Sequence, residues 1–312
     1  MIRMTLDIVA NESTAKQIIV CIPAFNEENN ISEIITKAKA YASEVVVYDD
    51  GSIDRTSDIA RDLGAVVIRN VRNKGYGKAL SELFKIALKR NADIMITLDS
   101  DGQHDPDQIP QIMDPLIKNE ADIVIGSRFL KKEDLQQVPA YRNFGIRAIT
   151  KFTQVVSYNK ITDAQSGFRA YNLNALTNLK LYEDGMAIST EILLKANELN
   201  LRVAEVPITI TYNGNGSTHN PLAHGIAVFT HLFRYLSFKK PLVFYGIPGL
   251  IMLVVSSLFM YSALDLFSTT RFVSTNMIII SLGFAIMGIL LLATSAIVYT
   301  LITLFKGKLR EI

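Results

Sequence analysis

The sequence has a single cysteine, Cys21, no tryptophan and four histidines among its 312 residues. A lone cysteine excludes an internal disulfide, and its apolar neighbours predict a buried, reduced thiol. The histidines and the cysteine do not come at the spacing of a zinc site, and no serine, histidine and aspartate pattern indicates a nucleophilic triad. We therefore interpret His104, His224 and His231 as structural or interfacial residues.

A strong charge imbalance and an N-terminal signal peptide are also missing. The net charge of +2 favours no particular partner and gives no indication of nucleic-acid binding. Residues 1–17 lack the continuous apolar core of a signal peptide, so the first domain is expected not to be secreted.

Charge is absent from two long apolar stretches near the C-terminus, residues 241–264 and 272–305. Each exceeds the roughly 20 residues that span a bilayer, which predicts two transmembrane helices. Basic residues flank the pair on its outer sides, whereas the connecting loop is nearly uncharged: the flanks hold Lys239, Lys240, Lys306, Lys308 and Arg310, and the loop holds Asp265 and Arg271. The positive-inside rule therefore predicts a multi-pass cell-membrane protein with its N-terminal domain and both termini in the cytoplasm.

The segment before the first span has the pattern of an amphipathic helix. Residues 222–238 place apolar side chains at helical spacing, with histidine and arginine between them. Such a helix lies on a membrane surface, and an ordinary core-facing helix has the same pattern, but the position directly before a span favours the membrane. We predict three parts: a cytosolic α/β domain over 1–219, a juxtamembrane helix over 220–240 and a two-helix transmembrane region over 241–312.

Up to about residue 130, apolar runs alternate with segments of helical periodicity. The runs predict strands at 17–23, 44–50, 65–70, 94–99 and 121–127, and helices are expected at 28–42, 53–63, 77–90 and 107–119. Because each strand is apolar throughout, the alternation is typical of a mostly parallel, Rossmann-like sheet covered on both faces. The alternation then fails, and only helices at 141–158 and 186–199 and an extended run at 203–212 are expected.

Polar residues gather where the predicted strands end. Asn26 with Glu27, Asp49 with Asp50, residues 99–101, and Ser127 with Arg128 each follow an apolar run. Because ligands of parallel sheets bind beyond the carboxyl ends of the strands, these residues are expected to lie along one ligand-binding edge.

Four aspartates follow the fourth predicted strand within residues 99–107. Asp99 and Asp101 are predicted to share one Mg²⁺ or Mn²⁺ ion, with Gln103 adding a neutral oxygen. A D-x-D pattern alone is weak support, because it also occurs in turns and helix caps. Asp105 precedes Pro106 and is expected to cap the next helix instead.

The other strand ends suit a nucleotide. Residues 49–52 offer acceptors for a base edge or for ribose hydroxyls, and residues 23–27 form a loop that can pack beside a base. Residues 73–78 make a glycine-rich turn before a helix, with two lysines near an expected anion site. Each segment alone is also explained as an ordinary turn, but their gathering at one sheet edge favours the nucleotide.

Six segments together resemble one enzyme family. CIPAFNEE, YDDGS, NKGYGKAL, LDSDGQHDP, GSRF and DAQSGFRAY, within about residues 17–212, are similar to the inverting glycosyltransferases of family two, which have the GT-A fold. Within these, the chain resembles the polyprenyl-phosphate glycosyl synthases, such as dolichyl-phosphate mannose or glucose synthase. The resemblance implies transfer of a hexose from a UDP- or GDP-linked sugar to a polyprenyl (dolichyl) phosphate, with inversion, for glycan or glycoprotein assembly.

The resemblance also implies residue roles. Nucleotide-sugar binding is implied for Pro23, Phe25, Glu27, Asp50, Lys74, Asp99, Ser100 and Asp101, metal binding for Asp99, Asp101 and Gln103, and acceptor-phosphate binding for Arg128 and Arg142. Asp163 is expected near the sugar or the acceptor, so the catalytic candidates are Asp101, Arg128, Arg142 and Asp163. Arg147 and Arg169 are weaker candidates, and Arg169 is alternatively explained by pairing with an acid in the core.

The implied partners are a nucleotide sugar (UDP-glucose, UDP-GlcNAc or GDP-mannose), a polyprenyl phosphate and the lipid bilayer, and a homo-oligomer is compatible with the sequence. One departure concerns the loop after the last strand, where relatives often carry Lys or Arg: residues 212–219 offer only His219, which puts closure of this loop over phosphate in doubt. Two alternatives are a processive polysaccharide synthase, disfavoured by the absence of tryptophan, and a non-catalytic membrane scaffold, disfavoured by the intact D-x-D pair.

Overall fold

The structure, a computed structural model, describes residues 16–130, 161–210 and 240–308, together with positions 150, 230, 233 and 236–238. The chain forms two compact units, Met1–Val228 and Phe229–Ile312. The predicted helix at 141–158 with Arg142 and Arg147, most of the predicted juxtamembrane helix and the loop at 212–219 lie outside the described residues.

The described part of the first unit is built on a seven-stranded, mostly parallel sheet with the order β3-β2-β1-β4-β6-β5-β7. The strands are β1 (Ile18–Ala24), β2 (Glu44–Asp49), β3 (Val66–Arg69), β4 (Ile94–Thr97), β5 (Ile123–Ser127), β6 (Arg169–Asn172) and β7 (Val203–Pro207). Only β6 runs against its neighbours, β4 and β5, among these strands. Strands β1, β2, β4 and β5 therefore end at the same edge of the sheet.

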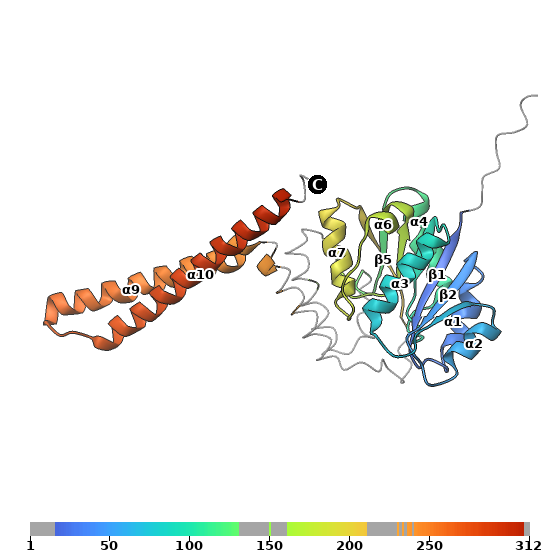
Figure 1. Cartoon of the computed structure of the whole chain (residues 1–312), viewed down its shortest axis with the longest axis horizontal. Coiled ribbons are helices and arrows are strands. Elements are labelled where there is room, and N and C mark those ends of the chain that lie inside the picture. Colours follow the sequence, from blue (N-terminus) through green and yellow to red (C-terminus); the bar gives the residue numbers. More distant parts are fainter. Residues whose placement is uncertain are drawn as a thin grey trace, which may run out of the picture. The chain divides into compact units, whose positions relative to one another are not determined.

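Helices cover both faces of this sheet (Figure 1). They are α1 (Ile31–Ala38), α2 (Thr56–Asp62), α3 (Tyr76–Lys89), α4 (Ile109–Ile117), α6 (Leu173–Asn178) and α7 (Ile188–Glu198), with a short 3₁₀ helix η1 (Pro106–Gln108) before α4. Side chains of β1 alternate between the faces: Val20 and Ile22 pack with α1 and α4, whereas Ile19 and Cys21 pack with α3 and α7. This period of two, with both faces covered, explains the apolar runs.

The five strands and four helices expected before residue 130 are confirmed, with ends that shift by a few residues. Asp105 is confirmed as a cap, because its side chain accepts from the N–H of Asp107 at the start of η1. Cys21 is buried and free, as predicted.

Strand β6 was not expected from the sequence, because it is short and begins with a charged residue. The Arg169 guanidinium is buried and donates to the main-chain carbonyls of Ala164, Ser166 and Ser189 at 2.8, 2.8 and 3.0 Å. Backbone carbonyls take these hydrogen bonds, and the Arg169 charge also lowers the pKa of Asp99, so the interpretation of Arg169 as a core residue agrees with its burial. A buried cation with these partners lets a strand form where the pattern shows no apolar run.

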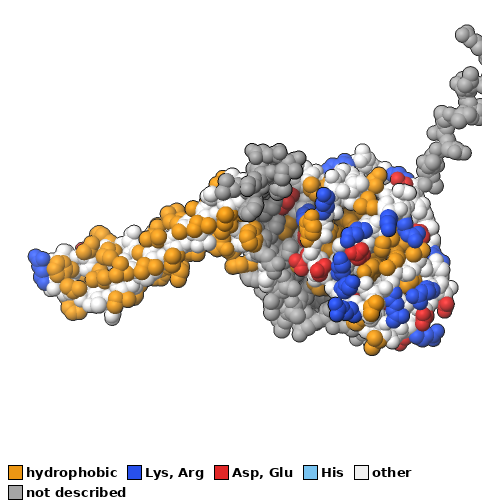
Figure 2. Space-filling view, in the orientation of Figure 1, with side chains coloured by type: hydrophobic (Ala, Val, Ile, Leu, Met, Phe, Trp, Pro, Cys, Tyr) orange, Lys and Arg blue, Asp and Glu red, His pale blue; other side chains and the backbone are white. Residues whose placement is uncertain are grey.

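The second unit is a pair of long apolar helices, α9 (Ile247–Thr270) and α10 (Thr275–Lys308), with one π-helical turn, η3 (Leu242–Gly246), before α9. The stretches Leu242–Thr270 and Thr275–Thr303 are long and apolar enough to cross a membrane, with mean hydropathies of 2.2 and 2.5. Figure 2 shows hydrophobic side chains along the visible face of both helices. Their positions match the two predicted spans.

Small residues line the contact between α9 and α10. They recur every seven residues on each helix: Gly249, Ser256 and Ala263 on α9, and Ser281, Gly288 and Ser295 on α10. The Ser256 hydroxyl donates to the Ser281 carbonyl at 2.8 Å, and the Ser281 hydroxyl donates back to the Ser256 carbonyl at 2.9 Å. In a membrane no hydrophobic driving force brings helices together. Small residues stabilise the pair because they let the two backbones approach closely.

Gly288→Ala is expected to destabilise the helix pair, whereas Gly283→Ala in the same helix is not. A Cβ at Gly288 would lie 2.9 Å from the Gly249 carbonyl oxygen, whereas a Cβ at Gly283 has open space around it. Overpacking of this kind costs about 1–3 kcal/mol. Thermal unfolding of the detergent-solubilised variants measures the difference, and equal midpoints for the two would contradict the close backbone approach.

Candidate functional site

The predicted site residues do gather beyond one edge of the sheet. Residues 25–27 follow β1, Asp50 follows β2, residues 99–101 lie shortly after β4 and Arg128 follows β5. The Ser100 hydroxyl donates to the Pro23 carbonyl at 2.9 Å, which fixes the end of β4 to the end of β1. The prediction that these residues lie along one edge of the sheet is therefore confirmed.

Asp99 is held from several sides. The Tyr76 hydroxyl donates to its Oδ1 at 2.9 Å, and the His104 Nε2 lies 3.8 Å from its Oδ2. A Cβ at Gly167 would lie 2.1 Å from the Asp99 Oδ2, so only glycine leaves room for this carboxylate. The sequence singled out the segments that contain Tyr76 and Gly167 but gave neither residue a role.

The carboxylates at this edge repel one another. Burial and then the charge of Asp101 raise the pKa of Asp99 to about 6. Burial also raises the pKa of Glu27 to about 7, and the charge of Asp101 adds to this rise. Burial is the first cause of both shifts, and the three carboxyls place several negative charges close together once they are deprotonated. Such a cluster favours binding of a cation.

The donor set fits a hard divalent ion. Among the described residues no three His, Cys, Asp or Glu side chains converge on a metal position by themselves. Two carboxylates and one amide, from Asp99, Asp101 and Gln103, are the oxygen ligands that Mg²⁺ or Mn²⁺ takes while keeping positions for water and phosphate. Gly102 has a φ of +73°, and the Gln103 N–H donates to the Asp101 Oδ1 at 3.0 Å, which orders the turn.

His104 is a neutral, buried neighbour of this cluster. Burial and the nearby Arg128 cation lower the pKa of His104 to about 3, and its ring lies against Phe168 with centroids 5.5 Å apart. Its Nδ1 has no hydrogen-bond partner within the described part of the chain. The structural interpretation of His104 agrees with this burial, since a neutral ring cannot serve as a cation for phosphate.

The glycine-rich turn at 73–78 is fixed by Asp50. This buried carboxylate accepts from the N–H groups of Lys74 and Gly75 at 2.9 and 2.7 Å and from the Asn70 amide at 2.7 Å. The Lys78 N–H donates to the Asp184 carbonyl at 3.1 Å. These three N–H groups already have protein acceptors, so they are not available to an anion. The expected anion site near the two lysines stays a prediction. The Lys74 side chain remains exposed.

The loop after β1 is tied to the loop after β2. The N–H of Asn26 donates to the Ser52 hydroxyl at 2.9 Å, and the N–H of Glu27 donates to the Thr56 hydroxyl at 2.8 Å. Pro23 is buried, whereas Phe25, directly before these two anchors, is partly exposed. These bonds fix the loop in a position where Phe25 can pack against a planar ligand.

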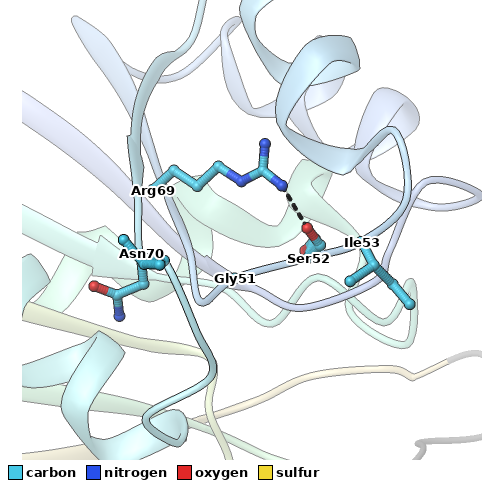
Figure 3. A pocket seen from close by; sticks show the side chains of 6 residues that line it. Gly51, Ser52, Ile53, Arg69 and Asn70 are labelled. Atoms are coloured by element: carbon cyan, nitrogen blue, oxygen red, sulfur yellow. Dashed lines mark hydrogen bonds between the residues drawn. The ribbon is translucent and has the colours of Figure 1, made fainter.

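A shallow depression of about 470 Å³ lies beyond β2 and β3. It is lined by Gly51, Ser52, Ile53, Arg69, Asn70 and Val71, and Figure 3 shows Arg69 reaching to the Ser52 carbonyl, to which it donates at 2.6 Å. Ile53 and Val71 are fully exposed at its rim. Asp49 is buried beneath this region and accepts from the Ser52 N–H and the Ser57 hydroxyl, so it is structural rather than a ligand acceptor.

Arg128 and Asp163 form a buried, two-bond ion pair. The Arg128 Nε and Nη2 donate to the two Asp163 oxygens at 2.6 and 2.8 Å. Burial alone raises the pKa of Asp163, but Arg128 outweighs it and holds that pKa below its ordinary value. Arg128 also lowers the pKa of Asp99, so its charge reaches the carboxylate cluster.

Glu205 on β7 holds this ion pair in place. Its carboxylate accepts from the Asp163 N–H at 2.9 Å and from the N–H and hydroxyl of Thr162 at 2.8 and 2.9 Å. Glu205 was not among the predicted site residues, although an acid inside the apolar run VAEVP is a signal that could have identified it.

Comparisons with known proteins agree with this architecture. Residues 19–179 match the model of Glycosyl transferase family 2. The UDP-N-acetylglucosamine–dolichyl-phosphate N-acetylglucosaminyltransferase of Methanococcus voltae is 30% identical over 72% of this chain and 96% of its own length. The dolichol-phosphate mannosyltransferase of Pyrococcus furiosus is 29% identical over 79% of this chain and 72% of its own length.

Solved structures share the fold. A glucosyl-3-phosphoglycerate synthase from Mycobacterium tuberculosis, in complex with Mn²⁺, uridine diphosphate and glucosyl-3-phosphoglycerate, aligns over 70% of this chain and 79% of that chain. The TM-score is 0.55 and the sequence identity is 23%, which establishes the GT-A fold alone.

Proposed function

The chain belongs to glycosyl transferase family 2, and on this premise we propose that it transfers a hexose from a UDP- or GDP-linked sugar to a polyprenyl phosphate, such as dolichyl phosphate, with inversion. The observation that carries the proposal is the carboxylate cluster of Glu27, Asp99 and Asp101 at the sheet edge, with Arg128 within electrostatic reach. Relatives named for dolichyl-phosphate substrates, and two apolar helices, support a lipid acceptor.

The donor half of the site follows from the loops at the strand ends. We assign the nucleoside to the surface between Phe25 and the turn at 73–75 that Asp50 fixes, with Lys74 beside it. A divalent ion held by Asp99, Asp101 and Gln103 would supply the Lewis acid that neutralises the departing nucleoside diphosphate. These residues orient the donor so that the anomeric carbon faces the acceptor.

The acceptor half needs positive charge rather than a base. A lipid monophosphate carries about −1.5 to −2 charges at neutral pH and is its own nucleophile, so no side chain has to remove a proton. Arginine suits this anion because its planar fork binds two oxygens at once. We assign this role to Arg128, oriented by Asp163, and to Arg142, which lies outside the described residues.

The membrane placement completes the proposal. The two apolar helices anchor the enzyme where a polyprenyl phosphate keeps its head group, and the basic flanks favour a cytoplasmic catalytic domain.

Release of nucleoside diphosphate by the purified full-length protein tests the function. With Mn²⁺ and a nucleotide sugar, release is expected to depend on added polyprenyl phosphate and to stop at one sugar per lipid. Lipid products that grow into long chains would instead indicate a processive synthase. No lipid-dependent release from UDP-glucose, UDP-GlcNAc or GDP-mannose would indicate a non-catalytic scaffold.

Metal binding is expected to weaken as the pH falls through about 6, the raised pKa of Asp99. A ligand carboxyl must be deprotonated, so lowering the pH from about 7.5 to 5.5 should weaken Mn²⁺ roughly fourfold through Asp99 alone. Because this pKa is raised on folding, the metal-free protein loses stability as pH rises from the ordinary aspartate value to about 6. Added Mn²⁺ should therefore raise the unfolding midpoint more at pH 7.5 than at pH 5.5, and Asp99→Asn should remove the difference.

A further inference from the structure

Tyr76 is the first residue of α3, and its hydroxyl is the donor that fixes Oδ1 of Asp99 at 2.9 Å. A phenol, with an ordinary pKa of about 10, is protonated at neutral pH and is therefore a hydrogen-bond donor. A neutral donor fixes the carboxylate without cancelling the charge that a cation needs.

The opposite side of Asp99 is closed by the backbone at Gly167. A Cβ there would lie 2.1 and 2.4 Å from the two carboxylate oxygens, and the Gly167 carbonyl is itself held by the Thr97 hydroxyl at 2.8 Å. The Asp99 carboxylate thus lies between the Tyr76 hydroxyl, from α3, and the backbone at Gly167, just before β6. Little rotation about its side-chain bonds is available without losing the Tyr76 bond.

The start of α3 that carries Tyr76 is itself held on both sides. On one side the N–H groups of Lys74 and Gly75 donate to Asp50. On the other, a Cβ at Gly77 would lie 2.4 Å from the Glu183 carbonyl oxygen, so the turn is pressed against the loop at 183–185. The same turn therefore fixes Asp50 through its backbone and Asp99 through a side chain, which sets the distance between the two carboxylates.

We propose that Tyr76 is a positioning residue of the donor site, which holds Asp99 so that its carboxylate and that of Asp101 meet one divalent cation. The inference rests on the metal assignment in the proposed function and adds a residue to it. Side chains that hydrogen-bond a metal ligand set its orientation, and their loss typically costs 10–100-fold in metal affinity.

Tyr76→Phe in the full-length, detergent-solubilised protein tests the inference. The change removes one hydroxyl and keeps the ring, so Mn²⁺ titration in the presence of UDP or GDP is expected to show about a 10–100-fold weaker Kd. The unfolding midpoint without metal is expected to stay near that of the unchanged protein, which separates positioning from a loss of structure.

Tyr41→Phe is the matched control. The Tyr41 hydroxyl also donates to an aspartate, Asp107, at 3.0 Å, but this pair lies on the surface away from the cluster. Tyr41→Phe is expected to leave the Mn²⁺ Kd within twofold of the value for the unchanged protein.

The outcomes separate the inference from the proposed function. Tyr76→Phe with an unchanged Mn²⁺ Kd would overturn the inference while lipid-dependent transfer by the unchanged protein still supports the function. An unchanged protein that binds no Mn²⁺ at all would overturn both the metal assignment and the role of Tyr76. A Kd that weakens equally in Tyr41→Phe would also overturn the inference, because the effect would not come from Asp99.

Discussion

Asp101→Asn is expected to lower turnover by about 10²–10³-fold, the loss seen when one preorganised electrostatic group is removed from a reaction site. Asparagine keeps the shape and still accepts from the Gln103 N–H, which now donates to Oδ1 at 3.0 Å. Burial is the main cause of the raised pKa values of Asp99 and Glu27, and the substitution removes the Asp101 charge that adds to them, so repulsion within the metal-free cluster falls. We therefore expect turnover and Mn²⁺ affinity to drop while the unfolding midpoint without metal stays level or rises.

Asp105→Asn in the same loop is the control for this substitution. Asp105 caps η1, and asparagine is as good an N-cap as aspartate. The turnover of Asp105→Asn is expected to stay within twofold of that of the unchanged protein. If Asp101→Asn kept more than a tenth of the turnover of the unchanged protein, the assignment of a metal to this turn would be wrong.

Arg128→Met is expected to lower the free energy of unfolding by about 3–5 kcal/mol, because it leaves the Asp163 carboxylate buried without its cation. Both side chains are nearly or fully buried, and the pair is joined by two hydrogen bonds. The pKa of Asp163 is lowered on folding, so the stabilisation is present at neutral pH and is lost only as the pH falls below the ordinary aspartate value of about 3.9. Chemical denaturation in detergent at pH 7 measures the loss.

Two further variants show whether the uncompensated charge causes the loss. Asp163→Asn added to Arg128→Met should recover a large part of the stability, because the buried charge is gone. Arg61→Met removes an exposed ion pair with Asp58 and should cost less than about 1 kcal/mol. A double variant no more stable than Arg128→Met would show that packing, not charge, accounts for the loss.

The sequence predicted the sheet edge well because the pattern there is local. Each strand from β1 to β5 is an apolar run that ends at polar residues, so the placement of Glu27, Asp50, Asp99 and Arg128 along one edge follows from strand direction alone. The cap at Asp105 was predictable for the same reason, since an aspartate directly before a proline is a local signal.

The contacts that hold these side chains were not predictable in this way. Tyr76 meets Asp99 across 23 residues, and Glu205 meets Asp163 across 42 residues, so both depend on how the strands are ordered in the sheet. The need for glycine at 167 arises only from the distance to Asp99. The carbonyl partners of Arg169 were not predictable either, because main-chain carbonyls leave no trace in a side-chain pattern.

The close contact between α9 and α10 limits what can pass between the two helices. Within the described parts of these helices, the Ser256 and Ser281 hydroxyls donate to each other's backbone carbonyls, and the Ser295 hydroxyl donates to the Pro241 carbonyl. The contact between these two helices therefore offers no polar path through the hydrocarbon layer, where burying a sugar phosphate without solvent costs much free energy. Under the proposed function, this helix pair is therefore not expected to carry the sugar phosphate of its product across the membrane.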